Sequence, residues 1–545
     1  MKEDLDLLIK NGRIIDGTGA PWFKSNLGIK DGKIVYIGKR EISASRVIDA
    51  SNLFVAPGFV DIHSHGDFTI VNSPEVKTKV MQGVTCELNG NCGMSVAPLK
   101  GEALKWAESA YSMYGAKILW RTFREYFEVL QRKGISINVA QLVGHGTVRM
   151  CVMGFEPRKP SPEELEEMKK LVEEAMMDGC IGMSTGLVYP PGFYADTEEI
   201  IELCKVVAKY DGIYASHVRG DRETQIESAQ EFIEIAEKAG ISAQLSHIEA
   251  KFPKNDPSFQ KWKLAMLEEA RSRGVDVTAD THEVQWIGVK DIRALLPFPW
   301  RTKTAEELYE ILKKDENMRE QIKKDMQLDP RDPRARGGPF GLTQQRAWHR
   351  VKVYKSNVNK ELNGKTIEEI AKIRNKQPED VLLDLFVEEN GKGPSLLLNY
   401  IESDMLTTAK HPLVVVPITD LTASNPEDLE GEMFENSPEW LGAFPNAIRK
   451  YALEYRYVTL EECIRKMTSL PYRIMKIWDR GIIRPGFWAD IVIFDKERIR
   501  CKSDLDRPKE YPEGIHYVIV NGEIVVENGE FTGKYPGKIL RHQYF

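Results

Sequence analysis

Short apolar runs alternate with amphipathic stretches through the middle of the chain. Eight runs have the length and β-branched content of buried strands, and they lie at residues 59–65, 83–91, 137–146, 179–187, 213–220, 242–250, 275–283 and 413–420. Several intervening stretches carry apolar residues at helical spacing, and the one that begins at Ser161 and Pro162 shows a capping pattern. Eight strand–helix units predict an α/β fold, a (β/α)8 TIM barrel, over residues 58–479.

Both ends of the chain have a different pattern, with short apolar runs joined by tight turns. The dipeptides Asn11-Gly12, Asp31-Gly32 and Asn521-Gly522 are strong two-residue hairpin signals. Neither end has enough strands for an independent sheet. We therefore predict one small β-sandwich built from residues 1–57 and 480–545, with the barrel inserted between its two parts.

The gap between the seventh and eighth predicted strands is unusually long. It contains a highly charged segment and a predicted pair of helices within residues 365–391. A gap of this length has its own structure or covers the site. We predict an insertion or lid at about residues 285–411.

Composition excludes several classes of protein. The 545 residues carry a formal net charge of -7 with no basic block, which argues against a nucleic-acid partner. There is no apolar run of about 18 residues and no signal-peptide pattern, so we expect no membrane span and a cytoplasmic location. The seven scattered cysteines argue against a disulfide framework. Whether the chain forms a homo-oligomer stays open.

Histidines and one aspartate mark the ends of several predicted strands. His63 and His65 form an H-x-H pair after the first strand, and alternation places both on one face. His217 ends the fifth strand, His247 the sixth and Asp420 the eighth. Barrel enzymes take their catalytic residues from the carboxyl ends of different strands. Only ten histidines are present, so four at such ends indicate a metal site rather than separate hydrogen-bonded histidines.

Cys92 lies just after the second strand, in the sequence GNCGM. Glycines on either side of Asn91-Cys92 let the backbone bend close to a metal ion. The alternative is a small buried thiol. Beside four histidines, a thiolate ligand is the stronger interpretation, and zinc suits a mixed sulfur, nitrogen and oxygen site.

These residues, together with VAPGFVDIHSH, resemble the pattern of the amidohydrolase superfamily. GVTCELNGNCG, STGLVYPPGFYADTEEI and the stretches at 466–495 and 511–537 resemble the N-acyl-D-amino-acid deacylase (D-aminoacylase) family across nearly the whole chain. The resemblance implies a tightly held zinc on Cys92, His217 and His247. It implies a second, weaker divalent metal near His63, His65 and Asp420.

The resemblance also implies a reaction. A metal-bound hydroxide would attack a linear C–N amide bond, and Asp420 would act as general base and then general acid. The alternatives are a cyclic-amide hydrolase or a dipeptidase with the same metal site. A non-catalytic barrel scaffold is disfavoured, because every metal-binding residue is kept. For Asp420 itself, a helix cap is the alternative role.

The predicted substrate pocket departs from the family. The family has a lysine two residues after the strand-six histidine, where this chain has Glu249, followed by Lys251. Both tyrosines of the family's strand-seven motif are missing, because this chain reads Asp280-Thr281-His282-Glu283-Val284 there. The lost groups hold the substrate carboxylate in the family, and such a group needs charged donors. We therefore hypothesise a small-molecule amide with a neutral or cationic group at this position.

Three further residues have two interpretations each. Tyr189 matches a family position near the scissile carbonyl but also fits a packing role. Arg219 is a candidate for binding substrate, or it pairs with nearby Asp221. His145 fits a supporting role more than a ligand. Either Lys251 or Arg219 would restore a carboxylate clamp.

Overall fold

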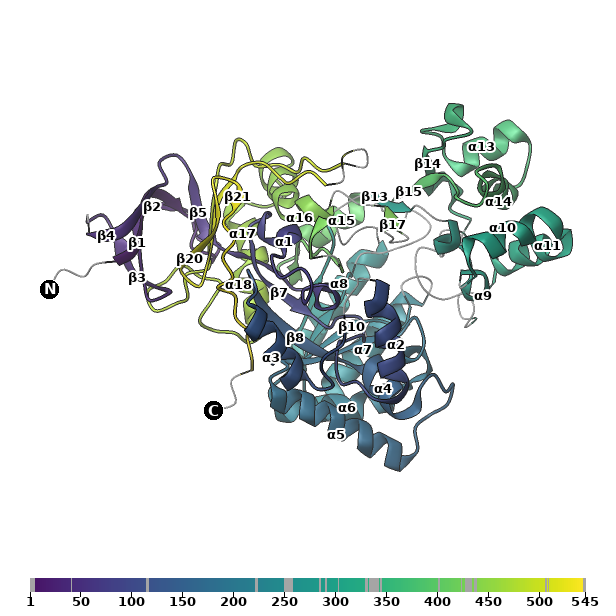
Figure 1. The fold of residues 1–545 in the computed structure, drawn as a ribbon, viewed down its shortest axis with the longest axis horizontal. Coiled ribbons are helices and arrows are strands. Elements are labelled where there is room, and N and C mark those ends of the chain that lie inside the picture. Colours follow the sequence, from purple (N-terminus) through teal and green to yellow (C-terminus); the bar gives the residue numbers. More distant parts are fainter. Residues whose placement is uncertain are drawn as a thin grey trace.

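The structure is a computed structural model. It describes residues 5–40, 42–113, 117–220, 224–248, 258–283, 286–289, 292–301, 303–328, 332, 343, 346–399, 402–422, 424–426, 434–435, 439–504, 507 and 509–542. Figure 1 shows strands from the two termini on one side, a central body of strands and helices, and a separate group of helices on the opposite side.

A parallel sheet of eight strands forms the central body, in the spatial order β16-β12-β11-β10-β9-β8-β7-β6. Every predicted strand contributes one member: β6 (Phe59–Asp61), β7 (Val84–Asn89), β8 (Asn138–Gly144), β9 (Gly182–Gly186), β10 (Ile213–His217), β11 (Ser242–Leu245), β12 (Val277–Asp280) and β16 (Val414–Val415). Helices follow the strands along the chain, as parallel connections require. They are α1 (Lys77–Val80), α2 (Gly101–Met113), α3 (Phe123–Lys133), α4 (His145–Met153), α5 (Pro162–Asp178), α6 (Thr197–Lys209), α7 (Gln225–Ala239), α8 (Ser258–Ser272), α15 (Glu402–Lys410), α16 (Glu439–Ala447), α17 (Leu460–Met467) and α18 (Ser469–Ile474).

The two outer strands of this sheet, β6 and β16, are connected through the segments that follow them. The amide of Asp420 donates to the carbonyl of His63 at 2.9 Å, and the amide of His65 donates to the carbonyl of Leu421 at 2.9 Å. The carboxyl ends of the first and last strands are therefore held together.

The predicted cap of α5 is confirmed. Ser161 accepts from the amide of Glu164, the Glu164 side chain bonds back to Ser161, and Pro162 occupies the first turn.

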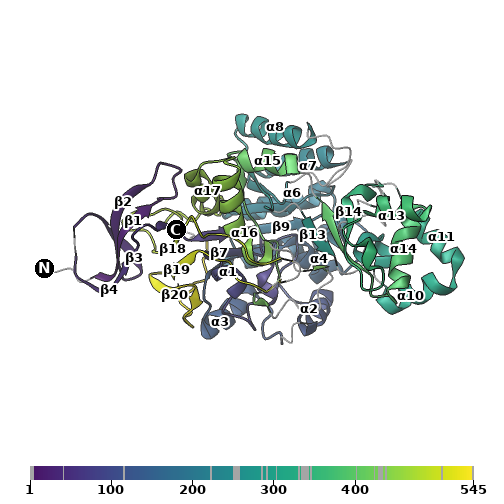
Figure 2. The same cartoon turned by 90° about the horizontal axis from the view of Figure 1, so that it is seen from above.

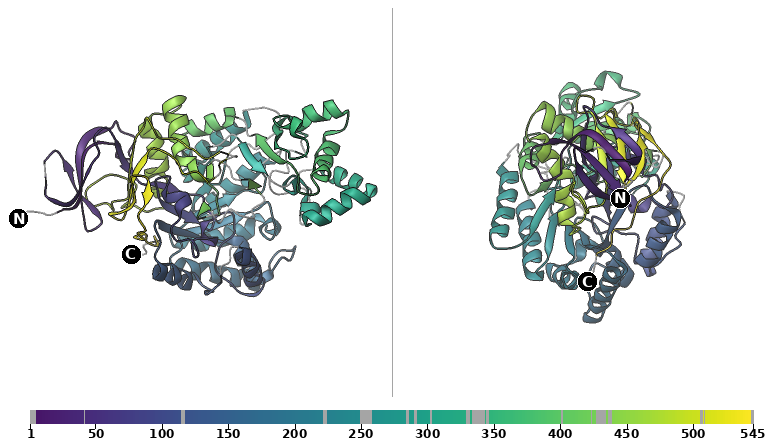
Figure 3. Two further views of the ribbon diagram at one scale, coloured as in Figure 1. Left: turned by 45° about the horizontal axis from the view of Figure 1, so that its top comes forward. Right: turned by 90° about the vertical axis from the view of Figure 1, so that its left-hand side faces the viewer.

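Both termini contribute to one sheet of nine strands (Figure 3). Its members are β1 (Leu5–Ile14), β2 (Phe23–Lys30), β3 (Lys33–Gly38), β4 (Ala44–Asp49), β5 (Phe54–Pro57), β18 (Ile491–Phe494), β19 (Ile515–Val520), β20 (Glu523–Glu527) and β21 (Glu530–Phe531). The link between the ends is the antiparallel pairing of β5 with β18.

Two of the three predicted hairpin turns are confirmed. Asp31-Gly32 joins β2 to β3 and Asn521-Gly522 joins β19 to β20, with positive φ at all four residues. The prediction for Asn11-Gly12 is wrong, because these residues lie inside β1 at a register shift against β2. Asn11 adopts φ 61° there, and its amide donates to the Asn26 side chain, as in a β-bulge rather than a turn.

Buried residues between Ile292 and Leu398 form a hydrophobic core of their own, and Figure 2 shows the helices of this part apart from the central strands. A four-stranded antiparallel sheet contains β13 (Trp286–Val289), β14 (Val351–Lys355), β15 (Ser395–Asn399) and β17 (Phe434–Glu435). Its helices are α9 (Phe298–Arg301), α10 (Ala305–Lys314), α11 (Glu316–Asp325), α13 (Ile367–Arg374) and α14 (Pro378–Glu388). The predicted helix pair corresponds to α13 and α14. Among the described residues, no helix is long and apolar enough to span a membrane.

Candidate metal centre

Six side chains meet beyond the carboxyl ends of five strands. His63 and His65 follow β6, Cys92 follows β7, His217 ends β10, His247 follows β11 and Asp420 follows β16. Cys92 is at the centre of the cluster: its Sγ lies 3.3 Å from His63 Nε2, 3.7 Å from His217 Nδ1 and 3.8 Å from His247 Nε2. Asp420 Oδ1 lies 2.9 Å from His65 Nε2 and 3.3 Å from His63 Nε2.

The cluster contains two overlapping sets of metal-binding groups. One set is His63, His65, Cys92 and Asp420, and the other is Cys92, His217 and His247, with the ligand atoms of each set within 4.8 Å of one another. Thiolate, imidazole and carboxylate together are the donor types that zinc prefers. These residues therefore fit one or two zinc ions, with Cys92 common to both sets.

Three of the six residues have an unusual backbone conformation. Cys92, His247 and Asp420 have φ of 52°, 35° and 53°, in the left-handed region that side chains disfavour. Gly93, beside Cys92, packs so closely that a Cβ would lie 2.5 Å from the Gly186 amide nitrogen. The packing around the strand ends thus holds these metal-binding residues in backbone conformations that their own φ/ψ preferences disfavour.

Charges in the cluster support one another. Burial opposes ionisation of Cys92, but His63, His217 and His247 hold the pKa of its thiol well below the usual value. Burial also opposes charge on His63, while Cys92, Asp420 and Asp280 raise its pKa. For Asp420, burial is outweighed by His63, His282 and His65, which lower its pKa. The protein therefore favours an ionised thiolate and carboxylate, the forms that bind a cation.

Two buried carboxylates, Asp61 and Asp280, hold metal-binding residues in place. The sequence analysis did not predict this role. Asp280 accepts from the amide of His247 at 2.6 Å and lies 3.6 Å from His63 Nδ1. Asp61 bonds to buried Lys79 and to the hydroxyl of Thr419, the residue before Asp420. Their positions in the sequence could have indicated this role, because Asp61 stands two residues before His63 and Asp280 ends the seventh strand.

Two of the predicted substrate-binding residues lie at the cluster. Tyr189 donates from its hydroxyl to the carbonyl of Cys92 at 2.5 Å, and its ring contacts the ring of His217. His282 Nε2 lies 3.7 Å from Asp420 Oδ2, and its ring stacks against that of His247. Their roles toward substrate stay predictions.

Arg219 is held by other protein groups. Its guanidinium bonds to the carboxylate of Glu231 and donates to the carbonyls of Phe193 at 3.0 Å and Ala195 at 2.9 Å. It therefore fixes the loop after β9 to α7 in this structure. Glu249 and Lys251, like Asp221, lie outside the described residues.

His145 belongs to a buried polar group beside the site. Its Nε2 lies 2.8 Å from the carboxylate of Glu199, which also bonds to Arg149 at 2.5 Å. All three side chains are buried. This arrangement places His145 in an ion-pair network and outside both sets of metal-binding groups.

Glu283, next to His282, gives a prediction for the pH dependence of stability. Burial raises the pKa of its carboxyl from 4.5 to about 7, although Lys450, the Asn446 amide and His282 lower it. The folded state therefore prefers the protonated acid, and this group lowers stability as pH rises from its unfolded to its folded pKa. At about pH 8 we expect Glu283→Gln to be more stable than wild type by about 3 kcal/mol, and at about pH 4 to be equal.

Urea unfolding of both proteins at the two pH values measures this difference. Glu75→Gln, at a carboxylate that contacts the Tyr535 hydroxyl near the surface, is the control and should show no such pH-dependent gain. An equal difference at both pH values for Glu283→Gln would contradict the assignment.

The fold and the cluster define a metal-dependent hydrolase, and comparisons with known proteins place it in a family. Residues 46–317 and 419–526 match the amidohydrolase family. D-aminoacylase of Alcaligenes xylosoxydans xylosoxydans is 30% identical over 99% of this chain and 98% of its own length. N-acyl-D-glutamate deacylase of the same organism is 29% identical over 99% and 97%. The chain belongs to the amidohydrolase family.

A solved structure is similar over the full length. N-acyl-D-glutamate deacylase from Bordetella bronchiseptica, complexed with zinc and a phosphonate inhibitor that mimics the tetrahedral intermediate, superposes with a TM-score of 0.74. It is 26% identical, and the match covers 99% of this chain and all of that one. The predicted family resemblance is thereby confirmed.

Proposed function

We propose that this protein is a zinc-dependent amidohydrolase that cleaves a linear N-acyl amide at the cluster centred on Cys92. The observation that carries the proposal is the meeting of His63, His65, Cys92, His217, His247 and Asp420, in two sets whose ligand atoms lie within 4.8 Å of one another. Relatives along the whole chain carry the names D-aminoacylase and N-acyl-D-glutamate deacylase. Both names describe removal of an acyl group from nitrogen.

Zinc would be held by Cys92, His217 and His247, with a second, weaker divalent metal at His63, His65 and Asp420. Bound there, it would acidify water and polarise the amide carbonyl. The chain's own residues supply the proton transfers. Asp420 would take the proton of the attacking water and deliver it to the nitrogen of the leaving amine. His65 at 2.9 Å and His282 at 3.7 Å flank its two oxygens and orient it.

The fold would serve this chemistry in three parts. We propose that the eight-stranded sheet acts as a (β/α)8 barrel, since the hydrogen bonds of His63 and His65 connect its outer strands. The terminal strands would form the small β-sandwich at residues 1–57 and 480–545. The insertion at about 285–411 would cover the site. Its position after β12 places it on the chain between His282 and Asp420.

The substrate group next to the amide nitrogen would be neutral or cationic. Arg219 is the candidate for binding a substrate carboxylate among the described residues. It is held by Glu231 and two backbone carbonyls. His282 stands at a position where the family resemblance implies a carboxylate-binding group. A substrate carboxylate would have to displace Arg219 from its partners, which costs binding free energy.

A hydrolysis screen of the zinc-loaded protein tests the proposal. It compares N-acetyl-D-amino acids, their α-carboxamides, the matching L compounds, dipeptides and cyclic amides. We expect a linear N-acyl carboxamide to exceed the matching N-acyl amino acid in kcat/KM by about tenfold, the size of one charge-assisted contact. N-acetyl-D-amino acids as the best substrates would contradict the pocket assignment. Cleavage of cyclic amides alone would contradict the linear amide, and cleavage of dipeptides alone would favour the dipeptidase alternative.

A further inference from the structure

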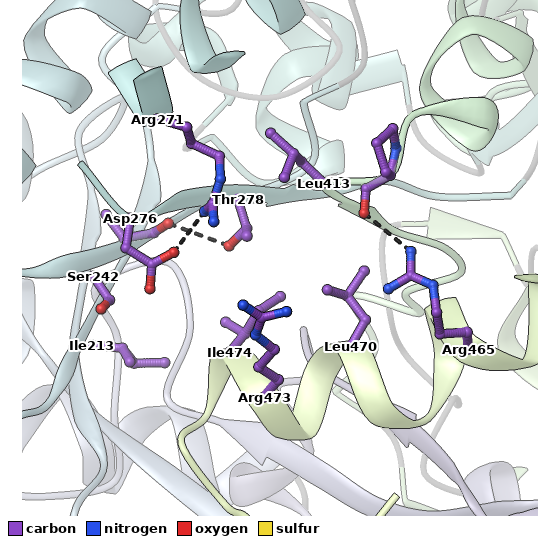
Figure 4. A pocket seen from close by; sticks show the side chains of 12 residues that line it. Ile213, Ser242, Arg271, Asp276, Thr278, Leu413, Arg465, Leu470, Arg473 and Ile474 are labelled. Carbon is purple, nitrogen blue, oxygen red and sulfur yellow. Dashed lines mark hydrogen bonds and ion pairs between the residues drawn. The ribbon is translucent and has the colours of Figure 1, made fainter. Parts of the chain in front are cut away.

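A second pocket lies at the opposite end of the central sheet from the metal centre (Figure 4). Its volume is about 270 Å³. Ile213, Ser242 and Leu413 line it, at or just before the starts of β10, β11 and β16, whereas the metal-binding residues follow the strand ends. The sheet thus separates the two, so occupants of the pocket do not reach the metal centre.

Three arginines reach this pocket, but two of them are already paired. Arg271 bonds to Asp276 at 2.6 Å and to the carbonyl of Val277. Arg465 bonds to Glu462 through two hydrogen bonds of 2.7 Å and donates to the carbonyl of Pro412 at 3.2 Å. These pairs neutralise both charges and fix both side chains at the rim.

Arg473 is the exception. It stands on α18 and projects from the helix into the pocket (Figure 4). Among the described residues, its guanidinium has no ion-pair or hydrogen-bond partner, and the side chain is exposed. One positive charge in the pocket is therefore uncompensated, with planar donors that match a carboxylate.

Six of the twelve residues that line the pocket are apolar. Ile213, Ala243, Pro412, Leu413, Leu470 and Ile474 contribute to its lining. An apolar surface with one uncompensated arginine matches a molecule with one negative charge and a short hydrocarbon tail. A dianion such as phosphate matches less well, because Asp276 also lines the pocket and Arg271 and Arg465 are already paired.

We propose that this pocket binds a small monocarboxylate with an aliphatic tail, with the carboxylate on Arg473 and the tail against Leu413, Leu470 and Ile474. The site is separate from the metal centre, and the proposal does not depend on the proposed function. Ser242 also lines the pocket and adds polar surface, whereas the hydroxyl of Thr278 already donates to the Gln244 side chain at 2.5 Å.

Titration calorimetry of the zinc-loaded protein with acetate, butyrate, hexanoate and octanoate tests the proposal at low ionic strength. We expect affinity to increase by about fourfold for each added methylene until the pocket is full. Arg473→Gln should weaken hexanoate binding by at least about tenfold, the size of a charge-assisted hydrogen bond. Arg473→Lys should retain part of the affinity, because the charge remains.

Arg40→Gln is the matched control, since it removes an exposed arginine next to β3 in the terminal sheet. It should bind hexanoate as wild type does, and this excludes a general effect of net charge. The comparison of wild type with Arg473→Gln also distinguishes hexanoate in this pocket from hexanoate bound to zinc. Binding to zinc would be the same in both proteins. Equal hexanoate affinity in wild type and Arg473→Gln overturns the proposal. So does undetectable binding in wild type, or inorganic phosphate that binds more tightly than hexanoate.

Discussion

Asp420→Asn should lower kcat by about a thousandfold while KM and the content of the zinc held by Cys92, His217 and His247 change little. Asparagine keeps the size and the carbonyl oxygen of the side chain but cannot accept a proton, and general acid–base catalysis contributes about 10²- to 10⁴-fold. Asp420 occupies the position that this role needs, with His63, His65 and His282 within 3.7 Å of its oxygens. Steady-state kinetics on the best substrate of the screen, together with zinc analysis, measure both quantities.

A matched substitution separates catalysis from general effects of losing a carboxylate. Asp211→Asn removes a carboxylate that pairs with Lys476 just before β10, at the opposite end of the strand from His217. It should keep wild-type kcat. Full turnover in Asp420→Asn would show that another residue moves the proton, and the role of Asp420 would then be limited to binding metal.

Cys92→Ala should lower zinc affinity by at least about 100-fold and abolish turnover at limiting zinc. Loss of supporting groups around a metal already costs 10- to 100-fold, and Cys92 is the one described residue common to both sets of ligands. Its Sγ lies within 3.8 Å of three imidazole nitrogens. Without the thiolate, those histidines lose the negative charge that balances a divalent ion. Dialysis followed by metal analysis gives the affinity.

Cys86→Ala provides the comparison, since Cys86 is a buried thiol on β7, the strand that leads to Cys92. Burial raises the pKa of Cys86, which is the opposite of the shift at Cys92. Cys86→Ala should keep its zinc. If Cys92→Ala held zinc as tightly as Cys86→Ala does, the thiolate ligand would be refuted.

The strands of the parallel sheet and the meeting of the metal-binding residues could be predicted, because both follow from the alternation of apolar runs and amphipathic stretches along the chain. Each apolar run became a strand of the parallel sheet, and residues at the carboxyl ends of parallel strands meet at one edge. His217 and Asp420 lie far apart along the chain and still reach one cluster. The family resemblance then supplied the roles that position alone did not give.

Details that depend on tertiary partners could not be predicted in this way. Asn11-Gly12 has the dipeptide of a hairpin, yet pairing with β2 on one side and with β4 on the other turns it into a bulge. Arg219 pairs with Glu231 on the next helix, α7, a contact that no local sequence pattern indicates. Lys79 carries no motif, and only the fold brings it to Asp61 and Thr419.

Zinc K-edge absorption spectroscopy of the purified protein tests the central claim most directly, because it identifies the atoms bound to the metal. The account predicts one sulfur at about 2.3 Å together with imidazole nitrogens at about 2.0 Å. Cys92 is the described cysteine that lies among the histidines, so the sulfur shell should disappear in Cys92→Ala. A shell of nitrogen and oxygen alone in the wild-type protein would contradict the account.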